Sequence, residues 1–282
     1  MTVRFVKRNV YFLSFLGLLA LASCESNDSE LTLNDTLTTE EVQNVVLADD
    51  YSSDVEDVIE DDAVVTEVAG RGHTPPSNHP DCLIRTVEET TNGKIVTLDF
   101  GDGCEGRRGR IFAGKIIIEY TRVDGTFSKV VSFEGFSVND NGIEGSVSVS
   151  KMQENSNGNP ERSYAVDITI NLSTGETITK KGEKVKEMIE GADTDTRGDD
   201  VFLITGFWES VNKYGEVFKA TITTPLRREY ACKFIVSGVV EITKGGNDYT
   251  LDFGDGSCDN KATITDADGN TREITLRERR RR

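Results

Sequence analysis

Histidine is almost absent from this sequence, and its scarcity narrows the possible chemistry. The 282 residues include two histidines, His73 and His79, both in a proline-punctuated segment just before Cys82. Such a segment is a poor place for a general base, which must be held in a fixed geometry, so most histidine-dependent nucleophilic triads are excluded. Two imidazoles beside an oxidised cysteine would also make a weak metal site. We therefore expect both histidines to be exposed loop residues that bind no metal.

Basic residues are also scarce relative to acids. The chain has 32 Lys and Arg against 49 Asp and Glu, which gives a formal net charge of −17. Nucleic-acid binding depends on an excess of positive charge, so nucleic acid is not expected as a partner. The acids are unevenly placed, because residues 25–67 hold 15 of them and no Lys or Arg.

No apolar run is long enough to predict a membrane-spanning helix. The longest run, residues 10–22, follows a short basic segment, and this is the pattern of a signal peptide over residues 1–23. The run closes with Leu-Ala-Ser-Cys24, which resembles the lipobox of bacterial lipoproteins. The resemblance implies that Cys24 becomes the first mature residue and is the site of lipid attachment.

Lipid on Cys24 would make the membrane the first partner of the chain. Lipoproteins with this motif carry two or three acyl chains, and durable anchoring needs at least two. The polar, acidic residues 25–29 resemble an export tract found in outer-membrane and surface lipoproteins of the Bacteroidota. We therefore expect a lipid-anchored outer-membrane protein that faces the cell surface. Ordinary secretion with an accidental cysteine is the alternative.

The four other cysteines are expected to form disulfides, because an even number in an exported chain favours oxidation over metal binding. Asn92-Gly93 predicts a two-residue hairpin turn, and residues 245–247 predict a second hairpin. Two cysteines lie across the open end of each hairpin, within about two residues of register. Each disulfide closes a loop for which chain entropy gives about 3 kcal/mol. The predicted pairs are Cys82–Cys104 and Cys232–Cys258.

Residues 24–80 are expected to form an acidic tether with short helices. Apolar residues between Val42 and Ala63 recur at intervals of three and four, which is helical spacing. Ser53 and Glu56 have the spacing of a capping box. We expect one or two helices whose acids form a solvated face that keeps the protein soluble, and a partner-binding acidic arm is the alternative.

Beyond residue 80 the pattern changes to the alternation of β-strands, with Asn, Asp and Gly at the turns between them. Residues 180–190 are ambiguous, and their neighbours favour a strand. We predict a mainly β protein, an antiparallel meander that forms a sandwich or barrel-like stack with two disulfide-stapled hairpins. Its parts are a first β half (81–190), a second β half (191–276) and a basic tail (277–282). The predicted strands are 95–100, 115–120, 128–136, 143–151, 163–172, 201–211, 217–223, 234–243 and 249–253.

One sequence element occurs twice. Thr-Leu-Asp-Phe-Gly-Asp-Gly precedes Cys104, and the same seven residues precede Cys258 with one inserted serine, which indicates a duplication. Together with Gly114-Lys-Ile-Ile-Ile and Ile222-Thr-Thr-Pro-Leu-Arg, this element resembles an uncharacterised family of Bacteroidota envelope lipoproteins. The resemblance implies a cellular location and a fold but no activity.

Two Asp-rich segments are candidate calcium sites. Asp266-Ala-Asp268-Gly-Asn270 places oxygens at loop positions one, three and five, and a poorer match begins at Asp193. Neither has the glycine at position six or the glutamate at position twelve that an EF-hand loop requires. We therefore predict turns and assign no metal and no cofactor.

The only tryptophan lies beside a phenylalanine, in Phe207-Trp208. Adjacent strand residues point to opposite faces, so one of the two should face solvent or a partner layer. Core packing is favoured over a glycan-stacking platform.

These features favour a non-catalytic envelope lipoprotein, a β module for binding or structural support with an unknown glycan or protein partner. No catalytic residue is assigned. The alternative is a carboxylate-dependent surface hydrolase acting on glycans, because two carboxyl groups at a suitable separation suffice for that chemistry.

Overall fold

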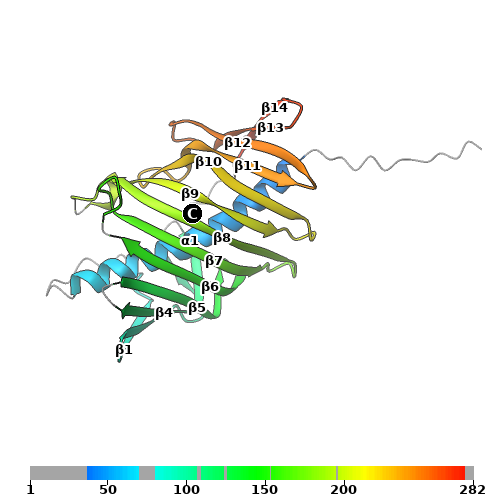
Figure 1. Ribbon diagram of the computed structural model, residues 1–282. Helices are drawn as coiled ribbons and strands as arrows, with labels where there is room; N and C mark the ends of the chain where they lie inside the picture. Colours follow the sequence, from blue (N-terminus) through cyan, green and yellow to red (C-terminus); the bar gives the residue numbers. More distant parts are fainter. Residues whose placement is uncertain are drawn as a thin grey trace, which may run out of the picture. The chain divides into compact units, whose positions relative to one another are not determined.

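One antiparallel sheet of 14 strands contains almost all of the regular β structure (Figure 1). The computed structural model describes residues 37–69, 80–106, 109–123, 126–152, 154–194 and 196–276. The predicted signal peptide, Cys24, both histidines and the basic tail lie outside these residues. The strands pair in sequence order from β1 to β14, except that β3 pairs with β4 alone, and the sheet is not closed.

Most strands have ten residues or more, and the short ones lie near the two ends of the sheet. A 3₁₀ turn, η2 (Arg197–Asp199), precedes β9. The strands are β1 (Ile84–Thr90), β2 (Gly93–Asp99), β3 (Cys104–Glu105), β4 (Ile111–Val123), β5 (Thr126–Val138), β6 (Asn141–Met152), β7 (Glu161–Asn171), β8 (Thr177–Glu190), β9 (Val201–Val211), β10 (Val217–Glu229), β11 (Ile235–Lys244), β12 (Asn247–Asp255), β13 (Lys261–Thr265) and β14 (Thr271–Thr275).

The predicted antiparallel meander is confirmed, but its second layer is not another sheet. One helix, α1 (Thr39–Ala69), crosses one face of the sheet (Figure 1). We call the face that α1 covers the inner face and the opposite one the outer face. The expectation of a sandwich or barrel-like stack is corrected accordingly. Alternation along a strand shows that one side is buried, but it does not show whether a sheet or a helix buries it.

The acidic segment forms a single helix of 31 residues instead of one or two short ones. Its first turn is fixed by a capping box. The Thr38 hydroxyl accepts a hydrogen bond from the Glu41 amide at 3.2 Å, and the Glu41 carboxylate accepts one from the Thr38 amide at 2.6 Å. The box predicted at Ser53 and Glu56 is wrong, because both lie inside the helix and the Glu56 carboxylate contacts lysines of the sheet.

The acids of α1 do not form a solvated face. Glu56 and Asp62 have no exposed surface, and Asp54 and Glu60 are each 4 % exposed. They share the buried side of the helix with apolar residues, so no purely apolar stripe marks that side in the sequence. The expectation of a solvated acidic face is therefore wrong, and the physical reason is that the sheet supplies buried cations opposite these acids.

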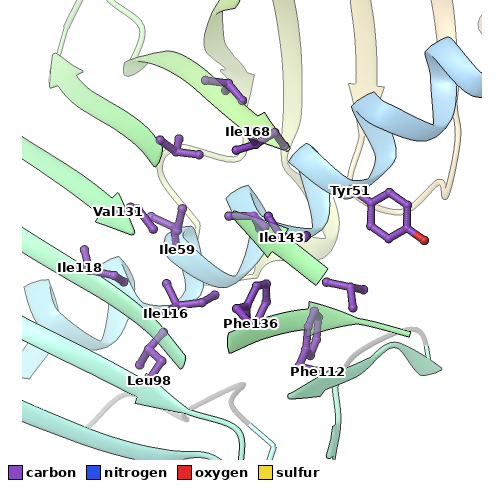
Figure 2. Packing of buried hydrophobic residues seen from close by; sticks show 14 of the residues in the cluster. Tyr51, Ile59, Leu98, Phe112, Ile116, Ile118, Val131, Phe136, Ile143 and Ile168 are labelled. Atoms are coloured by element: carbon purple, nitrogen blue, oxygen red, sulfur yellow. The ribbon is translucent and has the colours of Figure 1, made fainter. Parts of the chain in front are cut away.

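Apolar residues of the sheet form two clusters beneath α1. Tyr51 and Ile59 belong to the first cluster, with residues of β2 to β8, and Figure 2 shows Ile59 among isoleucine and valine side chains of the sheet. Leu37 and Val42 belong to the second cluster, with residues of β9 to β14. Burial of each such side chain contributes about 1.5–3 kcal/mol, so the helix links two cores that the sheet alone would leave open.

All nine predicted strands are present, and the ambiguous residues 180–190 belong to β8. The short strands β3, β13 and β14 were not predicted, and β1 was implied only by the predicted hairpin. The described residues all belong to one compact unit, so the two predicted β halves are parts of the same body.

The first hairpin turn is displaced from its predicted position. Its two turn residues are Thr91 and Asn92, and Thr90 lies opposite Gly93. A Cβ atom at Gly93 would lie 1.9 Å from the backbone oxygen of Tyr120 in β4. The glycine is therefore needed for the close approach of β4 and not for the turn. For this reason the Asn92-Gly93 pair did not mark the position of the turn.

Both predicted disulfides are present. The Cα atoms are 5.7 Å apart in Cys82–Cys104 and 5.8 Å apart in Cys232–Cys258, within the usual range for a disulfide. In both copies of the repeated element, an aspartate carboxylate binds a backbone amide close by, at the end of β2 in the first copy and within β12 in the second. Asp99 accepts a hydrogen bond from the amide two residues later at 2.9 Å, and Asp252 does the same at 2.8 Å.

Candidate functional site

The outer face of the sheet carries a groove that crosses β5 to β10. Strand register aligns one row of side chains across these six strands. Small residues occupy the row in β6 and β7, so the face is hollow there, and longer side chains stand beyond them in β8 and β9. The row contains Val130, Ser148, Ala165, Glu183, Phe207 and Thr221.

The groove has two connected parts that share Ser148, Ala165 and Glu183. The part around Phe207 has a volume of about 640 Å³, and the part around Ser150 and Ser163 has a volume of about 420 Å³. Both volumes lie within the range of about 300–1,000 Å³ that is common for ligand pockets. We call the two parts together the outer groove.

Charged residues form a second row beside Phe207. Lys181 Nζ lies 2.7 Å from Asp167 Oδ2, and Lys219 Nζ lies 4.0 Å from Glu209 Oε2. The hydrogen bond from Lys181 to Asp167 raises the pKa of Lys181. The groove thus offers cations, carboxylates and serine or threonine hydroxyls within one surface, beside an aromatic ring.

The two aromatic neighbours point to opposite faces, as predicted. Phe207 is 52 % exposed in the outer groove, whereas Trp208 is 6 % exposed in the second apolar cluster. Gly182 faces Trp208 from β8, and a Cβ atom there would lie 2.5 Å from the Trp208 Cβ. The glycine lets the β9 backbone at Phe207 and Trp208 approach closely. Core packing therefore holds for Trp208 and solvent exposure for Phe207.

A second charged cluster lies on the inner face, between α1 and β8. Lys184 Nζ lies 3.1 Å from Asp49 Oδ1 and 2.9 Å from Glu56 Oε1. Lys186 Nζ lies 3.0 Å from Glu56 Oε2, and Lys180 also bonds to Asp49. Both Lys184 and Glu56 are almost fully buried. We call these residues, with Glu60, the charge seam.

Burial and pairing compete in the charge seam. Burial raises the pKa of Glu56, but the ammonium groups of Lys184 and Lys186 outweigh it and lower that pKa to about 2. Burial lowers the pKa of Lys180 to about 8, because the attraction of Asp49 only partly offsets burial and repulsion from Lys184. Burial also disfavours charge on Lys184, but Asp49 and Glu56 outweigh it and raise its pKa.

The charge seam holds the helix against the sheet. Arg162 and Lys186 reach Glu60 at 3.7 and 3.2 Å, and Tyr164 donates a hydrogen bond to the same carboxylate. Sequence reasoning missed this cluster. The signal was present, since Lys180, Lys184 and Lys186 share one side of a strand and the acidic segment contains no cation of its own.

The Asp-rich segment at Asp266 forms a turn. The Asp266 carboxylate accepts hydrogen bonds from the Asp268 amide at 3.0 Å and from the Asn270 amide at 2.9 Å. Asp195, in the poorer calcium match, lies outside the described residues. Within the described ranges, no three or more His, Cys, Asp or Glu side chains gather as a metal ion would require.

No protein family, no curated protein and no solved structure matches this chain. In the described part of the chain, α1 lacks the apolar character of a bilayer-crossing helix. The function is therefore inferred from the geometry of the outer groove and from the sequence.

Proposed function

We propose that the protein is a membrane-anchored envelope or surface lipoprotein that binds a glycan in its outer groove without catalysis. The signal-peptide pattern and Cys24 support the anchor. The single observation that supports binding is the exposed ring of Phe207 in a groove lined by hydroxyl and charged side chains.

Phe207 suits a glycan because sugar rings have apolar C–H faces and polar edges. An exposed aromatic ring can cover such a face, as aromatic side chains supply much of the buried area at binding surfaces. The hydroxyls of Ser148 and Thr221 and the charges of Lys181 and Glu183 line the same hollow, where they can bond to sugar hydroxyls. A few convergent polar groups beside an apolar surface are typical of ligand sites.

The test is glycan-array screening followed by calorimetry on the best ligand. Phe207→Ala should weaken binding about thirtyfold, the effect of losing about 2 kcal/mol at a central aromatic contact. Val217→Ala is the matched control, because Val217 is 46 % exposed and does not line the groove. Equal loss of affinity in both variants, or no glycan bound by the wild type, would contradict the proposal.

The anchor is tested separately by mass spectrometry of membrane fractions. The wild-type protein should begin at Cys24 with acyl chains on it, and Cys24→Ser should give an unlipidated chain. Protease treatment of intact cells then tests surface exposure, since a surface-facing protein is cleaved before the cells are lysed. An intact leader in the mature protein would contradict the anchor.

A carboxylate-dependent surface hydrolase is the second candidate, because Asp167, Glu183 and Glu209 all line the outer groove. Two of these acids contact lysines of neighbouring strands, so the geometry favours binding over hydrolysis. Incubation of the bound glycan with the wild type and Glu183→Gln separates the two functions. Cleavage that Glu183→Gln abolishes would establish the hydrolase, and an intact glycan supports the binding module.

A further inference from the structure

A separate hollow lies on the inner face, between the N-terminal half of α1 and strands β9 to β12. It has a volume of about 70 Å³. Apolar side chains make up most of its lining, among them Val45 and Val46 of α1 and Leu226, Ile242 and Phe253 of the sheet. We call it the inner cavity.

One polar group in the wall of the inner cavity has no partner. Trp208 lines the cavity and is 6 % exposed, and its Nε1 forms no hydrogen bond within the described residues. A buried N–H group without an acceptor costs about 1–3 kcal/mol. The cavity therefore contains a donor that an acceptor atom of a ligand would satisfy.

The lining of the cavity also includes an unpaired cation. Lys233 follows Cys232 of the second disulfide and forms no ion pair with any described residue. The other charges in the lining are already engaged. Arg228 contacts Asp57 at 3.4 Å, Asp49 contacts the lysines of the charge seam, and Asp50 also has a partner. Lys233 is thus the group available to an anion.

We propose that the inner cavity binds a short aliphatic carboxylate. Its hydrocarbon chain contacts the apolar walls, and its oxygens supply the partners that Lys233 and Trp208 lack. A cavity of this volume holds about five to seven groups the size of water, since each needs about 10–15 Å³ of such space, so it takes a carboxylate with a chain of about three to five carbon atoms. This site is independent of the outer groove, because the two lie on opposite faces of the sheet.

Intrinsic fluorescence tests the proposal directly, because Trp208 is the only tryptophan in the chain. The full-length protein is titrated with acetate, butyrate, hexanoate and decanoate, and with 1-hexanol as the uncharged match of hexanoate. Butyrate and hexanoate should give a saturable change in Trp208 emission, with weaker binding of acetate, decanoate and 1-hexanol. Affinity that rises through decanoate, or equal binding of 1-hexanol, would overturn the assignment, as would no saturable change.

Variants then locate the ligand. Lys233→Gln should weaken hexanoate binding about tenfold, and Lys261→Gln, which changes an exposed lysine on β13, should leave it unchanged. Val46→Phe fills the cavity and should abolish the response while an unchanged thermal midpoint shows that the protein is folded. Retained affinity in Lys233→Gln, or retained binding in folded Val46→Phe, would place the ligand elsewhere and refute the proposal.

Discussion

The two faces of β8 carry similar charged side chains in different surroundings. On the inner face, Lys180, Lys184 and Lys186 are buried against α1, whereas on the outer face Lys181 and Glu183 lie in the open groove. Exposed ion pairs contribute about 0–1 kcal/mol, but removal of one partner from a buried pair costs about 3–5 kcal/mol. The face on which a lysine lies therefore sets the size of its effect on stability, and its own partners set the sign.

The largest effect is expected for Lys184→Met, which removes a cation shared by two carboxylates. Asp49 and Glu56 would each lose one buried partner, so the free energy of unfolding should fall by about 3–5 kcal/mol. Urea denaturation measures it, with Lys181→Met as the outer-face control. A loss below about 1 kcal/mol in Lys184→Met would mean that the buried lysine behaves like a surface one.

Acid should weaken the inner face through Glu56. Because the folded-state pKa of about 2 lies below the ordinary 4.5, the stabilisation is complete above pH 4.5 and is lost as the pH falls toward 2. The shift corresponds to about 3 kcal/mol. Denaturation between pH 2 and pH 6 should show this loss, and Glu56→Gln should flatten the curve. An equally steep curve in the variant would assign the acid sensitivity to other groups.

Lys180 should behave in the opposite way to Lys184. Its folded-state pKa of about 8 lies below the ordinary 10.5, so the unfolded chain holds the proton more tightly between these values. Its charge therefore opposes folding below pH 8, and stability should rise by up to about 3 kcal/mol as the pH increases from 8 to 10.5. Lys180→Met should be at least as stable as the wild type at pH 7 and should lose this alkaline rise. Destabilisation by more than about 2 kcal/mol would show that Asp49 needs both lysines.

The smallest effect is expected on the outer face. Lys181→Ala breaks the contact with Asp167 at 2.7 Å, but the Lys181 side chain is 77 % exposed. Its removal should change the free energy of unfolding by less than about 0.5 kcal/mol. Thermal denaturation at low and high salt measures this difference. A larger, salt-dependent change would show that the groove charges act as a coupled network.

Much of this fold follows from local patterns, and the missing parts are non-local. The alternation that marked β8 and the spacing that paired Cys82 with Cys104 depend on nearby residues and were read correctly. Sequence reasoning placed Phe207 and Trp208 on opposite faces, yet it could not show that small side chains in β6 and β7 hollow the surface beside Phe207. The burial of the acidic segment depends on contacts such as that between Glu56 and Lys184. These two residues are separated by more than a hundred positions in the sequence, so no local pattern predicts their contact.

Helix α1 connects the two ends of the open sheet. Near its start, Gln43 donates a hydrogen bond to the Thr275 carbonyl in β14 at 3.4 Å, and near its end Asp62 contacts Arg85 in β1 at 2.6 Å. A mechanical pull on the chain upstream of Leu37 would therefore load the β14 contacts first and peel the helix away step by step toward β1. Tension would be absorbed by a sequence of small ruptures while the hydrogen bonds between strands stayed intact.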